Sequence, residues 1–138
     1  MIDEGSEFGA RVARRLRAEI VVWLTTVTPS GSPLPRPVWF FWDGEESVLV
    51  FSQRGARVRN IESNARVTLN FDGDGRGGDI VVFSGEATIG GDAPPADQAD
   101  EYLAKYDEHI ARIGLTPESF AQRYEVPVQI RLGRLDGY

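Results

Sequence analysis

Hydrogen-bonding and cationic side chains are concentrated in residues 52–60, directly after an apolar run of the sequence. This segment carries one hydroxyl group, two carboxamides and three guanidinium groups, on Ser52, Gln53, Arg54, Arg57, Arg59 and Asn60. A guanidinium group is planar and donates two parallel hydrogen bonds to a phosphate, and the free N–H groups at the start of a helix add further donors. The segment predicts a phosphate-binding site. The alternative that the same residues leave open is the solvated basic face of an ordinary helix.

Four aromatic rings follow one another in the segment Val38-Trp39-Phe40-Phe41-Trp42. A strand that buries one face alternates apolar and polar residues, and this run has too many consecutive rings for that pattern. Rings that face a pocket can flank a planar heterocycle while the strand backbone binds its edge. The run therefore predicts a binding surface for a planar ring. The alternative is a strand buried on both faces or at a dimer interface.

Other kinds of chemistry lack the residues that they need. The chain has no cysteine and one histidine, His109, so no thiolate site, metal site or Ser-His-Asp arrangement is expected. We expect His109, which lies beside Glu108 on a helical stretch, to be exposed and not catalytic. The net charge of −6 and the pI near 4.8 argue against a nucleic acid partner, which would require clustered cations.

The length and composition are those of one ordinary globular domain. Of 138 residues, 41% are hydrophobic and 26% are charged, and we expect residues 1–138 to form a single domain with one core. No apolar run reaches the roughly 18 residues of a membrane span, and the start of the sequence lacks a basic segment followed by an apolar one. We therefore expect a soluble cytoplasmic protein with no membrane partner.

Alternating and β-branched apolar residues predict a mainly β fold with additional helices. The expected strands cover residues 20–27, 34–42, 47–52, 66–72, 80–89 and 126–132, and the first three form a meander. Pro35 and Pro37 cannot donate ladder hydrogen bonds, so the first half of the second strand is expected at an edge or a bulge, and such an edge is open to a ligand or a partner. The expected helices lie in residues 6–18 and 53–64, and two more start near residues 92–95 and 116–118.

The colinear order of these motifs resembles the pyridoxamine 5'-phosphate oxidase-like family over roughly residues 8–90. The motifs are Val-Val-Trp-Leu-Thr-Thr-Val, Pro-Val-Trp-Phe, Val-Leu-Val-Phe-Ser, Arg-x-Arg-Asn-Ile and Asn-Ala-Arg-Val-Thr-Leu. The sequence looks most like the actinobacterial branch that uses the deazaflavin coenzyme F-420, and its single lysine among fifteen cationic residues is typical of a high-GC genome. The resemblance implies a six-stranded antiparallel split β-barrel. It also implies a homodimer with two cofactor sites at the subunit interface.

The resemblance also assigns cofactor-binding residues in this sequence. It implies that the cofactor phosphate binds at the end of the third strand and at the following helix, on Ser52, Gln53, Arg57 and Asn60. Many relatives have lysine in place of Arg57, which keeps the charge and changes its geometry. The second strand of the family lies along the isoalloxazine-like ring, which implies contacts from Pro37, Val38, Trp39 and Phe40. The strand that the partner subunit contributes corresponds to Ile80, Val81 and Val82.

In this family the cofactor carries out the redox chemistry, and the protein orients it in a dry pocket, so the lack of a candidate catalytic residue fits the resemblance. The resemblance implies an oxidoreductase that transfers a hydride from reduced coenzyme F-420 to an electron-poor small organic substrate. FMN is the alternative cofactor, because the two tricyclic rings are alike. The remaining alternatives are a non-catalytic protein that binds the cofactor or a haem-type ligand, and a structural dimer without a ligand.

Overall fold

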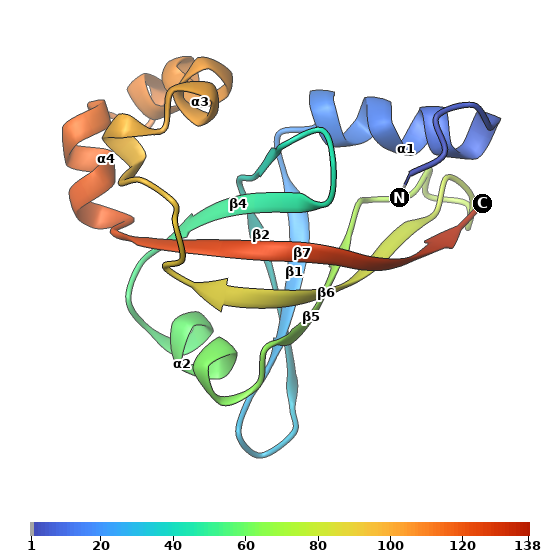
Figure 1. Cartoon of the computed structure of the whole chain (residues 1–138), viewed down its shortest axis with the longest axis horizontal. Coiled ribbons are helices and arrows are strands. Elements are labelled where there is room, and N and C mark those ends of the chain that lie inside the picture. Colours follow the sequence, from blue (N-terminus) through green and yellow to red (C-terminus); the bar gives the residue numbers. More distant parts are fainter. Residues whose placement is uncertain (1) are drawn as a thin grey trace.

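Residues 2–138 of the computed structural model form a curled antiparallel sheet surrounded by helices (Figure 1). Within these residues, seven strands lie in the order β2-β1-β5-β6-β7-β4-β3. They are β1 (Val22–Val27), β2 (Pro33–Val38), β3 (Phe41–Trp42), β4 (Ser47–Ser52), β5 (Arg66–Asn70), β6 (Val81–Ile89) and β7 (Val126–Gly137). The predicted mainly β antiparallel fold is confirmed, with seven strands where the sequence predicted six.

Every helix that the sequence predicted is present. Residues 2–138 contain α1 (Glu7–Ala18), α2 (Ala56–Ser63), the 3-10 helix η1 (Ala96–Gln98), α3 (Asp100–Arg112) and α4 (Pro117–Arg123). The hydroxyl group of Ser6 caps α1, and Thr116 forms a reciprocal capping box with Ser119 at the start of α4. We call residues 96–124 the helical insertion. It lies between β6 and β7 in the sequence and packs at one end of the sheet (Figure 1).

The additional strand arises because the predicted second strand, residues 34–42, forms two strands in the structure. β2 pairs with β1, whereas β3 pairs with β4 at the opposite edge of the sheet. Trp39 and Phe40 connect the two strands and belong to neither. The prediction of one continuous strand was therefore wrong. The edge position predicted for its proline-containing half is confirmed, because β2 is an edge strand.

The consecutive aromatic rings are accommodated because they enter two separate apolar clusters. Phe40 and Trp42 are buried in the main core, which the sheet forms with α1. Trp39 and Phe41 are partly buried and pack against a second cluster. The second cluster consists of Phe51, Ala96, Ala99, Tyr102, Tyr106, Ile110 and Phe120. The connection between β2 and β3 therefore lies between the main core and the helical insertion.

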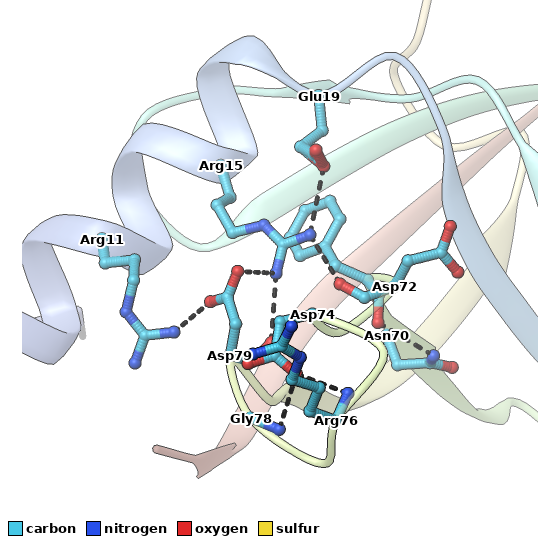
Figure 2. A network of polar contacts seen from close by, with 10 residues as sticks. Arg11, Arg15, Glu19, Asn70, Asp72, Asp74, Arg76, Gly78 and Asp79 are labelled. Atoms are coloured by element: carbon cyan, nitrogen blue, oxygen red, sulfur yellow. Dashed lines mark hydrogen bonds and ion pairs between the residues drawn. The ribbon is translucent and has the colours of Figure 1, made fainter.

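An ionic network attaches α1 to the loop between β5 and β6 (Figure 2). Asp79 forms ion pairs with Arg11 and with Arg15, the latter at 3.1 Å, and Arg15 also donates to the backbone oxygen of Asp72 at 2.7 Å. Asp79 has a φ of 54°, which few residues other than glycine, asparagine and aspartate adopt. The loop predicted over residues 73–78 is confirmed, and the network holds its end against α1.

None of the helices in residues 2–138 combines the length and the apolar character needed to cross a membrane. In the same residues, no three histidine, cysteine or carboxylate side chains come together as a group that would hold a metal ion.

Candidate functional site

A cavity of about 580 Å³ opens at the edge of the sheet beside β2. Its walls come from β2, the end of β4, the start of α2 and the helical insertion. One wall is polar and cationic, and the other is apolar and mostly aromatic. Within residues 2–138, no carboxylate side chain lines this cavity.

The polar wall is formed by residues 52–57 and by Arg36 on the edge strand β2. The buried hydroxyl group of Ser52 donates to the backbone oxygen of Gln53 at 2.8 Å and accepts from the guanidinium group of Arg57 at 3.1 Å. Gly55 precedes α2 and provides no capping side chain for the first N–H groups of this helix. The polar wall therefore presents guanidinium and backbone N–H donors.

The positive charge of this wall is not fully neutralised by protein carboxylates. Arg54 pairs with Glu125 at 2.7 Å, but the ion pairs in residues 2–138 include neither Arg36 nor Arg57. Burial is the main cause that lowers the pKa of Arg57; the charge of Arg36 lowers it further, and Tyr124 acts in the opposite direction. Two cations that repel each other favour a ligand with negative charge. The cavity therefore favours anions in a chain whose net charge is −6.

The apolar wall is formed by rings of the β2–β3 connection and of the helical insertion. These rings are Trp39, Tyr102, Phe120 and Tyr124, and Phe51 of β4 is the fifth aromatic residue that lines the cavity. The ring centroids of Trp39 and Phe120 are 5.8 Å apart with nearly parallel planes, and Phe120 stacks on Tyr124 at 4.6 Å. At the rim, Val21 is 41% exposed and Ile113 is 51% exposed. A wall of this composition fits the face of a planar ring.

A family model described as pyridoxamine 5'-phosphate oxidase matches residues 8–131. The chain belongs to this family. The curled sheet is accordingly the split barrel of the pyridoxamine 5'-phosphate oxidase family, and the resemblance stated from the sequence motifs is confirmed. A search of curated proteins found no match to this sequence.

Several solved structures share the fold. An F-420 reductase has a TM-score of 0.68 and 22% identity, over 89% of this chain and 94% of that one. An FAD-binding protein from Mesorhizobium loti has a TM-score of 0.66 and 19% identity, over 91% and 88% of the two chains. HutZ, the haem storage protein from Vibrio cholerae, has a TM-score of 0.63 and 15% identity, over 96% and 95%. These names describe three different ligands on one fold.

Six of the residues that the pyridoxamine 5'-phosphate oxidase resemblance assigned line the cavity: Pro37, Val38, Trp39, Ser52, Gln53 and Arg57. Phe40 and Asn60 do not. Phe40 is fully buried in the main core, and Asn60 is 4% exposed and donates from its carboxamide to the hydroxyl group of Thr26 at 3.1 Å. Both side chains therefore contact the interior of the protein and not the cavity.

The three residues assigned to the partner subunit lie where β6 begins. Val81 is buried in the main core, and the backbone of Ile80 forms two hydrogen bonds with Tyr138. Neither these residues nor Val82 line the cavity of their own chain. Their contact with a cofactor in a second subunit stays a prediction.

The sequence alone did not assign Arg36 or the rings of the helical insertion to a site. Arg36 stands between two prolines of an edge strand, and a cation at an exposed edge next to an aromatic run is a signal that could have identified it. Tyr102, Phe120 and Tyr124 belong to apolar helical stripes, and such stripes have the same pattern whether they face a core or a cavity. Only the packing of the helical insertion against Trp39 distinguishes these cases.

The prediction that His109 is exposed was wrong. Its ring meets the rings of Trp39 and Tyr106 edge-on, at 6.0 and 5.8 Å, and its Nδ1 atom is buried without a hydrogen-bond partner. The physical reason is that α3 packs on Trp39, which buries part of His109. The sequence predicted Trp39 inside a strand, so it gave no sign of this contact. His109 does not line the cavity.

Proposed function

We propose that this protein binds a phosphate-bearing flavin-type cofactor, coenzyme F-420 with FMN as the alternative, in the cavity beside β2. The observation that carries this proposal is one cavity with two guanidinium groups, on Arg36 and Arg57, that have no carboxylate partner, and with an aromatic wall. The guanidinium groups would bind the phosphate, and the aromatic wall would provide an apolar surface for the tricyclic ring. A volume of about 580 Å³ also lies in the usual range for small-ligand sites.

The residues present fit such a cofactor. Arg57, held by Ser52, would bind the phosphate together with Arg36, and the first N–H groups of α2 would add neutral donors. The outer edge of β2 would bind the polar edge of the ring. Trp39 and the rings of the helical insertion would exclude water from the ring.

The reaction that we propose is hydride transfer from the reduced cofactor to an electron-poor double bond of a small organic substrate, and a proton from solvent completes the reduction. The cofactor supplies the hydride chemistry when it is bound. The chain supplies orientation, positive potential and an apolar surface. The cavity walls in residues 2–138 hold no carboxylate and no histidine, which fits a reaction driven by the cofactor.

We also propose a homodimer in which each subunit covers the cavity of the other. The cavity opens at an edge strand, and its rim exposes Val21 and Ile113, so a second subunit would remove this apolar surface from water. The segment 80–82 of the second subunit would then contact the cofactor. Light scattering after size-exclusion chromatography tests this. A monomer that binds the cofactor with full affinity would contradict it.

Titration with FMN, riboflavin and coenzyme F-420 tests the binding proposal. Ligand binding is expected to quench the fluorescence of Trp39, and the variant Trp39→Phe measures its share of the signal from the three tryptophans. Saturable binding of FMN or coenzyme F-420 is expected, and riboflavin, which lacks the phosphate, should bind at least about tenfold more weakly than FMN. Failure of both phosphorylated cofactors to bind, or equal affinities for FMN and riboflavin, would contradict the proposal.

A carrier that binds the cofactor without catalysis is the second candidate. It is supported by the lack of a carboxylate or a histidine, which are common proton donors in enzymes, in the cavity walls. Assays with each reduced cofactor and a panel of quinones, enones and tetrapyrroles separate the two functions. Multiple turnovers that depend on the protein support the reductase, whereas tight binding without turnover across the panel supports the carrier.

A further inference from the structure

The connection between β2 and β3 requires hydrogen-bond partners from outside the sheet. Phe40 is fully buried, and neither Phe40 nor Trp39 has a partner in a strand ladder. Buried backbone N–H and C=O groups are almost always paired in folded proteins. Side chains from another element must therefore pair with the backbone of this connection.

Tyr106 on α3 provides this pairing. Its hydroxyl group accepts from the N–H of Phe40 at 2.8 Å and lies 2.8 Å from the carbonyl oxygens of both Phe40 and Ile20. The side chain of Tyr106 is itself fully buried, so water does not compete for these bonds. One phenol thus links the connection to the residues that precede β1.

Lys105, the neighbour of Tyr106, completes the arrangement. Its Nζ atom donates to the carbonyl oxygen of Phe40 at 3.0 Å and lies 3.8 Å from the centre of the Phe40 ring. Because Lys105 pairs with that oxygen, the single proton of the Tyr106 hydroxyl group is free for Ile20. None of the ion pairs in residues 2–138 includes Lys105. Its ammonium group is directed at the connection and not at a carboxylate.

The same connection forms part of the cavity wall. Trp39 lines the cavity next to Val38 of β2, and the Trp39 ring stacks on Tyr106 with centroids 4.9 Å apart and planes inclined by 8°. Tyr106 therefore contacts both residues of the connection, the backbone of Phe40 and the ring of Trp39. We propose that Tyr106 and Lys105 are positioning residues that hold the β2–β3 connection in the arrangement that receives the planar ring of the ligand. The identity of that ligand rests on the proposed function.

Hydrogen–deuterium exchange in the absence of ligand tests the structural half of this inference. Tyr106→Phe keeps the stacked ring and removes the hydroxyl group, and Lys105→Met keeps an apolar stem and removes the ammonium group. Tyr138→Phe is the matched control, because its hydroxyl group donates to a backbone oxygen, that of Gly77 at 2.8 Å, away from the cavity. Exchange of residues 38–42 is expected to accelerate about three- to tenfold in the first two variants. Exchange rates like those of the control would overturn the inference.

Ligand affinity tests the functional half. FMN carries ring and phosphate, whereas ribose 5-phosphate carries only a phosphate that the polar wall would bind. We expect Tyr106→Phe to bind FMN about three- to tenfold more weakly than wild type and to bind ribose 5-phosphate equally well. An equal loss for both ligands, or no loss, would overturn the positioning role. If wild type bound neither FMN nor coenzyme F-420, the proposed function would fail, and the exchange measurement would decide the inference independently.

Discussion

The guanidinium group of Arg57 is half-buried and donates a hydrogen bond to the hydroxyl group of Ser52 at 3.1 Å. It lies close enough to Arg36 for the two positive charges to repel. Burial and this repulsion both lower the pKa of Arg57, which means that its charge is disfavoured in the ligand-free protein. Ionisable groups with perturbed pKa values are concentrated at functional sites. An anion in the cavity would offset the repulsion between Arg36 and Arg57, and this would favour binding.

We predict that Arg57→Ala weakens cofactor binding by about one to two orders of magnitude, because a charge-assisted hydrogen bond of about 1.5 to 3 kcal/mol is lost. The melting temperature of the cofactor-free variant should not fall, because the charge that is removed is partly desolvated and repelled. Arg57→Lys should retain most of the affinity. Arg59→Ala is the control, since Arg59 is exposed on the same helix and lies outside the cavity. Titration calorimetry that gives equal affinities for Arg57→Ala and Arg59→Ala would place the phosphate elsewhere.

Lys105 should make a contribution to stability that depends on pH. Burial lowers its pKa to about 8 from the usual 10.5, and Glu19 acts in the opposite direction. Between these two values the unfolded chain binds more protons at this site than the folded chain, so the contribution of Lys105 to stability rises with pH from about 8 to about 10.5. We predict that the unfolding free energy of wild type, minus that of Lys105→Met, is larger near pH 10 than near pH 7.5 in urea titrations. A difference that stays constant or falls would show that the ammonium group is not desolvated.

At the scale of elements, the helical insertion converts an open edge of the sheet into a walled cavity. It contributes Tyr102 from α3, Phe120 from α4 and Tyr124 from the end of α4, and these rings line the same cavity as the polar wall. α4 has only seven residues, and so short a helix depends on its capping box and on packing. Phe120 is the residue through which α4 is packed, because it is 2% exposed.

We predict that Phe120→Ala lowers the unfolding free energy by about 3 to 5 kcal/mol, the usual cost of truncating a buried phenylalanine. The variant would leave a void between Trp39 and Tyr124, and it would remove the stacked contacts of Phe120 with both rings. Urea unfolding followed by circular dichroism measures it. Ile113→Ala, at a position 51% exposed on the rim, should cost much less. Similar losses in the two variants would mean that α4 is not held by Phe120.

The sequence predicted the elements well because turn residues and alternation are local signals. It could not predict that the chain crosses from one edge of the sheet to the other at Trp39 and Phe40, since this crossing depends on the closure of the sheet and on Tyr106, 66 residues away from Phe40. The part of the polar wall that residues 52–57 form was predictable, because these residues are adjacent in sequence. Asn60 shows the limit of that reasoning, because the fold pairs it with Thr26 on β1.

At the scale of the whole molecule, the network in Figure 2 joins α1 to the loop between β5 and β6 through Asp79. We predict that Asp79→Asn lowers the unfolding free energy by about 1 to 2 kcal/mol, since two partly buried ion pairs are weakened while asparagine tolerates the positive φ. Glu86→Gln, which breaks an exposed pair with Arg131, should change it by less than about 0.5 kcal/mol. Chemical denaturation measures both. Cofactor affinity should be the same in both variants, and a selective loss in Asp79→Asn would connect this network to the cavity.

The position of β7 has a consequence for how the protein is made. β7 follows every other strand of the sheet in the sequence, yet it lies between β6 and β4, where Val126 pairs with Ser52 of the polar wall. While a nascent chain is still on the ribosome, β4 and β6 have unpaired edges until residues 126–137 emerge, and such edges are sites of aggregation. Pairings between distant segments also form slowly, in milliseconds to seconds for small β-rich domains. A ligand that requires the complete polar wall can therefore bind only after β7 has been translated. A cofactor present at high concentration would then stabilise the newly closed sheet.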